Sequence, residues 1–151
     1  MRKNARLQVV CLSIMGIPCV AQTPSKDEGA IRLLLSNYAQ ARDHHDVKAE
    51  TLAYEEHADF WLFGAAPAHG RAAIEKSLEV NSSTYHFSLM VDNLRLLGND
   101  TAIADASIVA GPEGHSINMF AVYVIRKQDS KWHIVAARVG AGYASNQAPT
   151  K

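Results

Sequence analysis

The sequence predicts an α+β fold in which a cone-shaped, curved antiparallel sheet, built from one short strand and a four-strand meander, packs on three N-terminal helices. In the second half of the chain the apolar residues follow the period of strands, and turn signals rich in Gly, Asn and Asp divide that half into four segments. The expected strands are 86–97, 101–110, 116–127 and 131–139. Strands of this length span about 35 Å, and so tall a sheet twists and curls. Helices on its concave face would leave a cavity.

Three helices and one short strand are expected before the meander. Ser25 and Glu28 have the spacing of a capping box, which predicts that the first helix begins here. Ile31, Leu35 and Tyr38 then recur at helical spacing and mark its buried face. The other expected elements are a helix over 47–54 with Asp46 as N-cap, a strand over 58–63 and a helix over 70–81.

The first 21 residues have the pattern of a signal peptide. A basic start is followed by an apolar run over 7–17 and a small-x-small sequence that ends at Ala21. We therefore expect an exported protein, periplasmic or secreted; a lipid anchor on Cys19 is the weaker alternative, because Pro18 precedes the thiol. The expected organisation is a signal peptide (1–21), a linker (22–28), one cone domain (29–143) and a disordered tail (144–151).

Cleavage would change the composition of the chain. Both cysteines and three of the fifteen basic residues lie in the expected leader, so the mature chain would carry a net charge of −3. Without disulfides, an exported domain of this size depends on its hydrophobic core. A slightly acidic chain without a basic stripe argues against nucleic acid as a partner, and against a membrane once the leader is removed.

Both faces of the last two expected strands are apolar. Ala121 and Tyr123 alternate with Phe120, Val122 and Val124, whereas a sheet with one face in water shows polar residues at every second position. An apolar face that is not covered within the domain marks an interaction surface. We therefore expect a homodimer through the outer face of the sheet.

A series of motifs adds a family resemblance. In chain order they are Ala58-Asp59-Phe60, Gly64, Gly70-Arg71 with Ile74, Leu94 to Ala102, and Trp132 to Ala136. Their order and spacing resemble the SnoaL-like proteins of the nuclear-transport-factor-2-like superfamily, and the closest type is SgcJ/EcaC. The resemblance implies an α+β cone, usually dimeric. Members include ketosteroid isomerases, polyketide cyclases, dehydratases, epoxide hydrolases and non-catalytic binding modules, so the fold does not decide the function.

The resemblance carries over only part of the isomerase site. Tyr38 matches the tyrosine that donates a hydrogen bond to the substrate oxyanion. The position of the general base falls at Leu62 and that of the second acidic donor near Val122, so neither place holds a carboxylate. Proton abstraction by the isomerase mechanism is therefore not expected.

His86 and Arg138 are the charged candidates. His86 resembles a dehydratase histidine at the start of this strand, and its imidazole would act as acid or base near neutral pH; the alternative is a structural histidine at a strand end. Arg138 shares strand parity with Trp132 and is expected to face into the cone. It would then bind an anionic ligand or pair with a carboxylate such as Asp105, and otherwise it lies at a solvent-exposed rim.

The remaining candidates for ligand binding are Tyr54, Phe60, Leu62 and Tyr123. Phe60 and Leu62 would line the cone, and the two tyrosines would offer hydroxyl groups to it, unless those hydroxyls satisfy backbone carbonyls instead. With Leu62 inward, Asp59 points outward, where we expect a pairing with Arg71. No metal-ligand spacing and no dinucleotide or flavin motif occurs in the sequence, so no metal and no cofactor is expected.

The sequence thus predicts a cavity for a small molecule more firmly than it predicts a catalysed reaction. One hypothesis is a cofactor-free lyase, isomerase or cyclase for a small hydrophobic substrate, with His86 moving protons and Tyr38 stabilising negative charge. The other is a non-catalytic module for ligand binding or dimerisation, motivated by the missing carboxylate at Leu62 and the apolar lining.

Overall fold

The computed structural model describes residues 25–80, 86–112 and 114–141. The expected signal peptide and the expected tail lie outside the described residues. Helix α1 begins at Lys26, inside the stretch 22–28 that the sequence assigned to a linker, because the Ser25 capping box starts the helix there. Among the helices that the structure describes, none is long and apolar enough to cross a bilayer.

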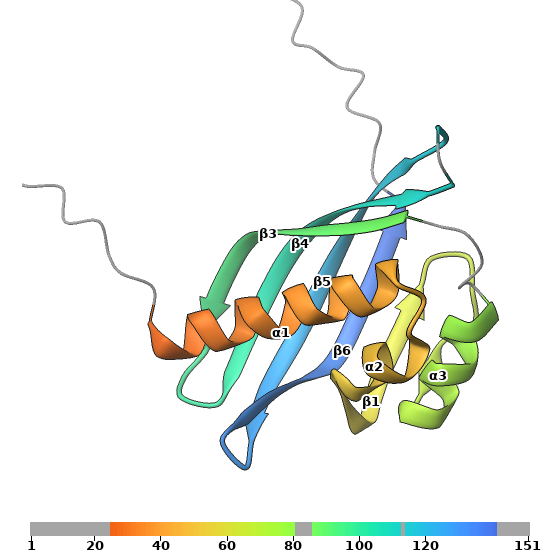
Figure 1. Cartoon of the computed structure of the whole chain (residues 1–151). Coiled ribbons are helices and arrows are strands. Elements are labelled where there is room, and N and C mark those ends of the chain that lie inside the picture. Colours follow the sequence, from red (N-terminus) through yellow and green to blue (C-terminus); the bar gives the residue numbers. More distant parts are fainter. Residues whose placement is uncertain (1–24, 81–85, 113, 142–151) are drawn as a thin grey trace, which may run out of the picture.

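The expected fold class is confirmed: helices cover one face of a single curled sheet (Figure 1). The elements are α1 (Lys26–Asp43), α2 (Val47–Leu52), β1 (Tyr54–Leu62), β2 (Ala68–His69), α3 (Arg71–Val80), β3 (His86–Leu96), β4 (Thr101–Gly111), β5 (Ile117–Gln128) and β6 (Lys131–Ala141). The strand order is β2-β1-β6-β5-β4-β3. The meander is antiparallel as expected, but β1 runs parallel to β6, so the sheet is mixed rather than purely antiparallel.

Helix α1 lies across the concave face of the sheet, as Figure 1 shows. Both hydrogen bonds of the capping box are present, and Ile31, Leu35 and Tyr38 form the buried face that the sequence predicted. The ring of Tyr38 makes edge contacts with Phe87 of β3 and Tyr123 of β5, with centroids 6.2 and 5.8 Å away. Strand β4 lies between those two strands, and its inward residues beside the helix are mainly small alanines. These small side chains leave room for the tyrosine.

Strand β1 begins at Tyr54, four residues before the strand expected at 58, and α2 ends at Leu52 rather than at 54. The reason is an irregular register: Tyr54 pairs with Ile134 of β6, yet Asp59 pairs with Ala136. Extra residues bulge out between these two pairs, and this charged stretch breaks the alternation by which strands are recognised. The Arg71 side chain stabilises the distortion by donating from Nε and Nη2 to the Tyr54 carbonyl at 3.1 and 2.7 Å.

A second irregularity changes which side chains of β6 face inward. Val124 of β5 pairs with Ala136, but Ile125 pairs with Ile134, so Val135 is an extra residue in β6. A one-residue shift moves every later side chain to the opposite face. Trp132 and Ile134 are buried before the bulge, and the odd-numbered Ala137 and Val139 are buried after it.

The turn after β4 requires a glycine at position 111, the last residue of that strand. Its φ is +151°, and a Cβ added there would lie 2.4 Å from the backbone oxygen of His115. We expect Gly111→Ala to lower the free energy of unfolding by about 1–3 kcal/mol. The added Cβ meets backbone atoms, so the backbone itself must move to make room for it. Urea denaturation measures this change.

Gly29 is the matched control for that substitution. It lies inside α1 and has nothing within 4 Å of an added Cβ. Gly29→Ala should raise the free energy of unfolding by about 0.5–1 kcal/mol, because alanine loses less backbone entropy in a helix. Equal effects of the two substitutions would contradict the strained turn.

Candidate functional site

A cavity of about 210 Å³ lies between the last turns of α1, helix α3 and the sheet, since its lining includes residues of all three. Nine of its eleven lining residues are apolar. The apolar lining consists of Phe60, Leu62, Leu78, Phe87, Ile108, Ala110, Ile117, Met119 and Val139. A dry cavity of about 150 Å³ in another protein accommodates benzene, so this volume suits roughly one substituted ring.

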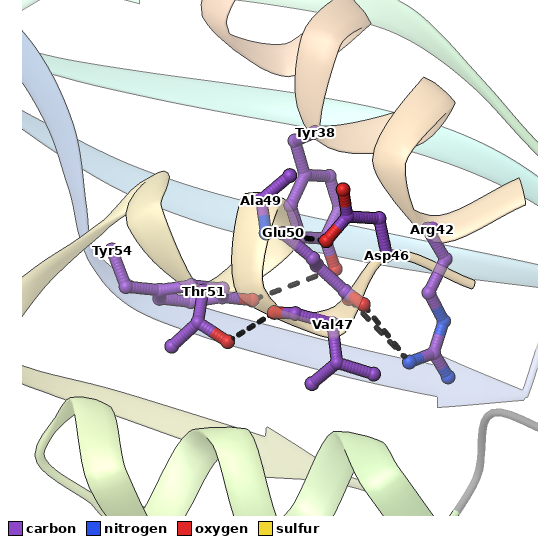
Figure 2. Close-up of polar contacts among 8 residues, drawn as sticks. All are labelled: Tyr38, Arg42, Asp46, Val47, Ala49, Glu50, Thr51 and Tyr54. Atoms are coloured by element: carbon purple, nitrogen blue, oxygen red, sulfur yellow. Dashed lines mark hydrogen bonds and ion pairs between the residues drawn. The ribbon is translucent and has the colours of Figure 1, made fainter. Parts of the chain in front are cut away.

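Tyr38 and Arg42, one helical turn apart on α1, are the polar residues of the lining. The Tyr54 hydroxyl donates to the Tyr38 hydroxyl across 3.5 Å (Figure 2), and the two rings meet edge to face. Burial, and next the neighbouring Tyr54, raise the pKa of Tyr38 well above its ordinary value. The phenol therefore keeps its proton at neutral pH and can donate a hydrogen bond to a ligand.

Glu50 is a buried carboxylate beside the candidate site that the sequence did not reveal. Its side chain is 1% exposed, and both carboxylate oxygens accept from Arg42 Nη1, at 3.3 and 3.5 Å (Figure 2). Burial raises the pKa of Glu50, and the Arg42 guanidinium opposes that rise. Arg42 also lies 6.0 Å from the centre of the Phe87 ring. The ion pair with Glu50 thus holds the Arg42 guanidinium beside the cavity.

The sequence contains a weak signal for this pair. Arg42 and Glu50 flank the turn His44-His45-Asp46, in which His45 adopts a φ of +58°. Asp46 caps α2 through a hydrogen bond to the Ala49 N–H at 3.0 Å (Figure 2). This cap sets the direction of α2, and so turns Glu50 toward α1.

Three of the predicted site residues line the cavity: Tyr38, Phe60 and Leu62. Two others, Tyr54 and Tyr123, are fully buried next to Tyr38 and are not part of the lining. Tyr54 donates to Tyr38, whereas the Tyr123 hydroxyl has no hydrogen-bond partner among the described residues. Burial and then the Tyr38 phenol raise the pKa of Tyr123. These two tyrosines support Tyr38 from behind rather than contact a ligand directly.

Arg138 does not face into the cone, which corrects the expectation from strand parity. The extra residue at Val135 reverses the parity of β6, so Arg138 is exposed on the outer face of the sheet. Its Nη1 donates to the Ala137 carbonyl at 2.9 Å. Asp105, the carboxylate that the sequence proposed as its partner, also lies on the outer face, where it accepts from Asn93.

His86 also lies outside the cavity. It is the first residue of β3, but Phe87 takes the inward position, so the imidazole is exposed. Its Nδ1 lies 3.6 Å from Asp43 Oδ1, the same oxygen that accepts from the Phe87 N–H at 2.8 Å. That N–H and then His86 lower the pKa of Asp43. The geometry favours the structural alternative, in which His86 helps to hold the end of α1 against the start of β3.

A smaller prediction concerns Asp59 of β1. Trp61, two residues later on the same strand, is 46% exposed. The expected pairing of Asp59 with Arg71 is wrong, because Arg71 is directed to the Tyr54 carbonyl. Asp59 instead pairs with His69 of the adjacent β2, with 2.6 Å between Oδ1 and Nδ1.

Comparison with known proteins identifies the fold. The sequence matches no family model and no curated protein. A cystatin-like-fold domain of unknown function from Nostoc punctiforme is similar in structure, with a TM-score of 0.73, 20% identity and 82% of each chain covered. A ketosteroid isomerase-like protein from Erwinia carotovora atroseptica has a TM-score of 0.70 at 12% identity, over 78% of this chain and 98% of that one.

A third similar structure is a nuclear-transport-factor-2-like protein with a cystatin-like fold from Novosphingobium aromaticivorans. Its TM-score is 0.66 at 19% identity, over 82% of this chain and 85% of that one. These similarities show that the chain has the cone fold of the nuclear-transport-factor-2-like proteins. That fold is consistent with the binding of small molecules.

Proposed function

We propose that this nuclear-transport-factor-2-like fold binds a small, mainly apolar molecule that carries an oxygen acceptor. The observation that carries the proposal is the composition of the cavity: an apolar wall with Tyr38 and Arg42 together at one side. A pocket of this kind obtains affinity from apolar contact and orientation from a few polar groups.

The polar groups define the chemistry of the ligand. Both can donate a hydrogen bond, because the Tyr38 phenol stays protonated and a guanidinium carries only donors. A carbonyl or carboxylate oxygen fits them, whereas a cationic amine would be repelled by the Arg42 guanidinium. Glu50 contacts Arg42 through Nη1, and within the described residues the other guanidinium nitrogens have no acceptor. These nitrogens are available to the ligand.

Binding without turnover is favoured over catalysis. A general acid or base must come within hydrogen-bond reach of the ligand. Among the described lining residues there is no carboxylate and no imidazole: Leu62 occupies the place of the isomerase base, and His86 lies outside. Glu50 is a buried carboxylate that pairs with Arg42, and it is not part of the cavity lining. A lyase, isomerase or cyclase remains the alternative function, with Tyr38 as its oxyanion donor.

Two finer assignments belong to the same proposal. The order of the SnoaL-like motifs, which runs from Ala58 to Ala136, supports a protein of the SnoaL-like type, closest to SgcJ/EcaC. The basic start and apolar run of residues 1–21 support export to the periplasm or the medium. Amino-terminal sequencing of the protein recovered from expressing cells tests the export proposal, and a first residue of Gln22 is the expected result.

A ligand series tests the binding proposal. We expect acetophenone and benzoate to raise the melting temperature, and ethylbenzene, which lacks the oxygen acceptor, to raise it less, since a ligand selective for the folded state stabilises it. Tyr38→Phe should weaken acetophenone binding by about two- to tenfold, the range for one neutral hydrogen bond. Mass spectrometry should recover the ligand unchanged; a new product would favour the enzyme alternative.

A pair of substitutions locates the binding. Ala110 lines the cavity and Val109, its neighbour on β4, is exposed on the opposite face. Ala110→Phe should fill the cavity and abolish the ligand effect, and Val109→Phe should leave it unchanged. Binding that survives Ala110→Phe, or no stabilisation by any member of the series, would overturn the proposal.

A further inference from the structure

We propose that Glu50 decides which oxygen compounds the cavity accepts: it favours neutral carbonyl compounds over carboxylates. This role rests on the proposed function and narrows the class of ligand. Tyr38 and Arg42 can donate a hydrogen bond to either kind of oxygen, so these two donors do not distinguish a ketone from a carboxylate. The distinction comes from the charge of Glu50, which is not part of the cavity lining.

The positive charge of Arg42 is already compensated. Its guanidinium forms an ion pair with the Glu50 carboxylate, with 3.3 Å between Nη1 and Oε2 (Figure 2). The Arg42 side chain is 18% exposed and that of Glu50 is 1% exposed, so solvent and salt screen this pair only weakly. The surroundings of the two donors therefore contain an arginine and yet have no net charge from this pair.

The effect of both charges is visible in three buried tyrosines. Burial is the main cause of the raised pKa of these phenols, which belong to Tyr38, Tyr54 and Tyr123. Among the smaller causes, Glu50 raises the pKa of each phenol and Arg42 lowers it, and the effect of Glu50 is the larger. Glu50 thus disfavours an anionic oxygen at the Tyr38 hydroxyl. A ligand oxygen that accepts from this hydroxyl lies one hydrogen bond away and is subject to the same repulsion.

A carboxylate loses more than a ketone when it enters this cavity. Nine of the eleven lining residues are apolar, so an anion gives up its hydration there. Burying a charge costs much more free energy than burying a carbonyl group, unless an opposite charge compensates it. Arg42 cannot provide full compensation because Glu50 is already paired with it. A ketone accepts the same hydrogen bonds without bringing a charge, so the cavity favours the neutral ligand.

A matched pair of ligands measures this preference. Acetophenone and benzoate have almost the same shape, because a methyl group of the first takes the place of one oxygen of the second. We expect the original protein at about pH 7 to bind acetophenone about tenfold more tightly than benzoate, or better, in titrations followed by ligand NMR. Equal affinities for the two ligands would overturn the role of Glu50, even if no variant were available.

Glu50→Gln removes the charge and retains a side-chain oxygen that can accept from Arg42. The uncompensated guanidinium should then tighten benzoate binding by about tenfold or more, and acetophenone binding should change by less than about threefold. Glu56→Gln is the matched control: it removes the same charge from an exposed residue of β1 and should leave both affinities unchanged. Adding Ala110→Phe to Glu50→Gln should abolish the gain, which would locate benzoate in the cavity.

A double variant separates the charge of Glu50 from its packing. Arg42→Met/Glu50→Met has neither charge, so benzoate should remain the weaker ligand, whereas a gain as large as that of Glu50→Gln would contradict an electrostatic cause. Circular dichroism establishes that each variant is folded. If acetophenone does not bind the original protein, the proposed function is wrong, and the role of Glu50 with it. If acetophenone binds but Glu50→Gln leaves the ratio of the two affinities unchanged, only the role of Glu50 is wrong.

Discussion

Arg42→Met is expected to lower the free energy of unfolding by about 3–5 kcal/mol at pH 7. The substitution preserves much of the apolar stem but leaves the Glu50 carboxylate buried, 1% exposed, without its cationic partner. Removing one member of a buried ion pair destabilises a protein by about this amount, because the remaining charge is uncompensated. Urea denaturation at one fixed protein concentration measures the change. Arg32→Met, at an exposed position of the same helix, is the control and should stay within about 0.5 kcal/mol.

The loss of stability caused by Arg42→Met should depend on pH and should be larger at higher pH. Burial already raises the pKa of Glu50 above its ordinary value of 4.5, and removal of Arg42, which opposes that rise, should raise it further. A folded state that holds the proton more tightly than the unfolded chain loses stability as pH increases between the unfolded and folded pKa values. Arg42→Met should therefore be nearest to the original protein in acid, where Glu50 is protonated, and should fall behind it as pH increases above about 4.5.

A double substitution separates the charge from the packing. Arg42→Met/Glu50→Met replaces the pair with apolar side chains and should recover most of the stability lost by Arg42→Met, since a buried ion pair is often no more stabilising than a hydrophobic substitute. If the double variant is as unstable as the single one, or if the single variant shows no pH dependence, the unpaired carboxylate is not the cause.

Leu35→Ala is expected to lower the free energy of unfolding by about 2–5 kcal/mol. Leu35 is completely buried on the face of α1 that packs on the sheet, and its truncation leaves a space that the surrounding side chains fill only in part. Leu33 lies two residues away on the same helix and is 61% exposed, so Leu33→Ala should change stability by no more than about 0.5 kcal/mol. The same denaturation experiment compares the two. Equal losses would contradict the packing of α1 through its Ile31, Leu35 and Tyr38 face.

Local patterns were enough to predict most of the elements. The capping box at Ser25, the helical spacing up to Tyr38 and the turn signals between the strands all depend on residues close together in the chain, and the structure has elements at these places. The start of β1 was missed because its pairing depends on contacts with β6, about 80 residues later, and on the distortion stabilised by Arg71.

The candidate site was harder to predict, because one residue of register decides which way a side chain points. Nothing in the local sequence marks Val135 as an extra residue, since β6 is apolar on both sides of it and alternation alone cannot reveal a shift. Arg138 was therefore placed inside the cone. The pairing of Arg42 with Glu50 was missed for a related reason: it joins two helices, and a helix as short as α2 has too few residues to show a periodic pattern.

The bulge at Val135 also divides a single strand between the two faces of the sheet. Beyond it, Ala137 and Val139 are buried, and Arg138, which lies between them in the chain, is exposed on the opposite face. Substitutions at adjacent positions of β6 thus act on different sides of the sheet, so a change at Arg138 need not alter the lining of the cavity.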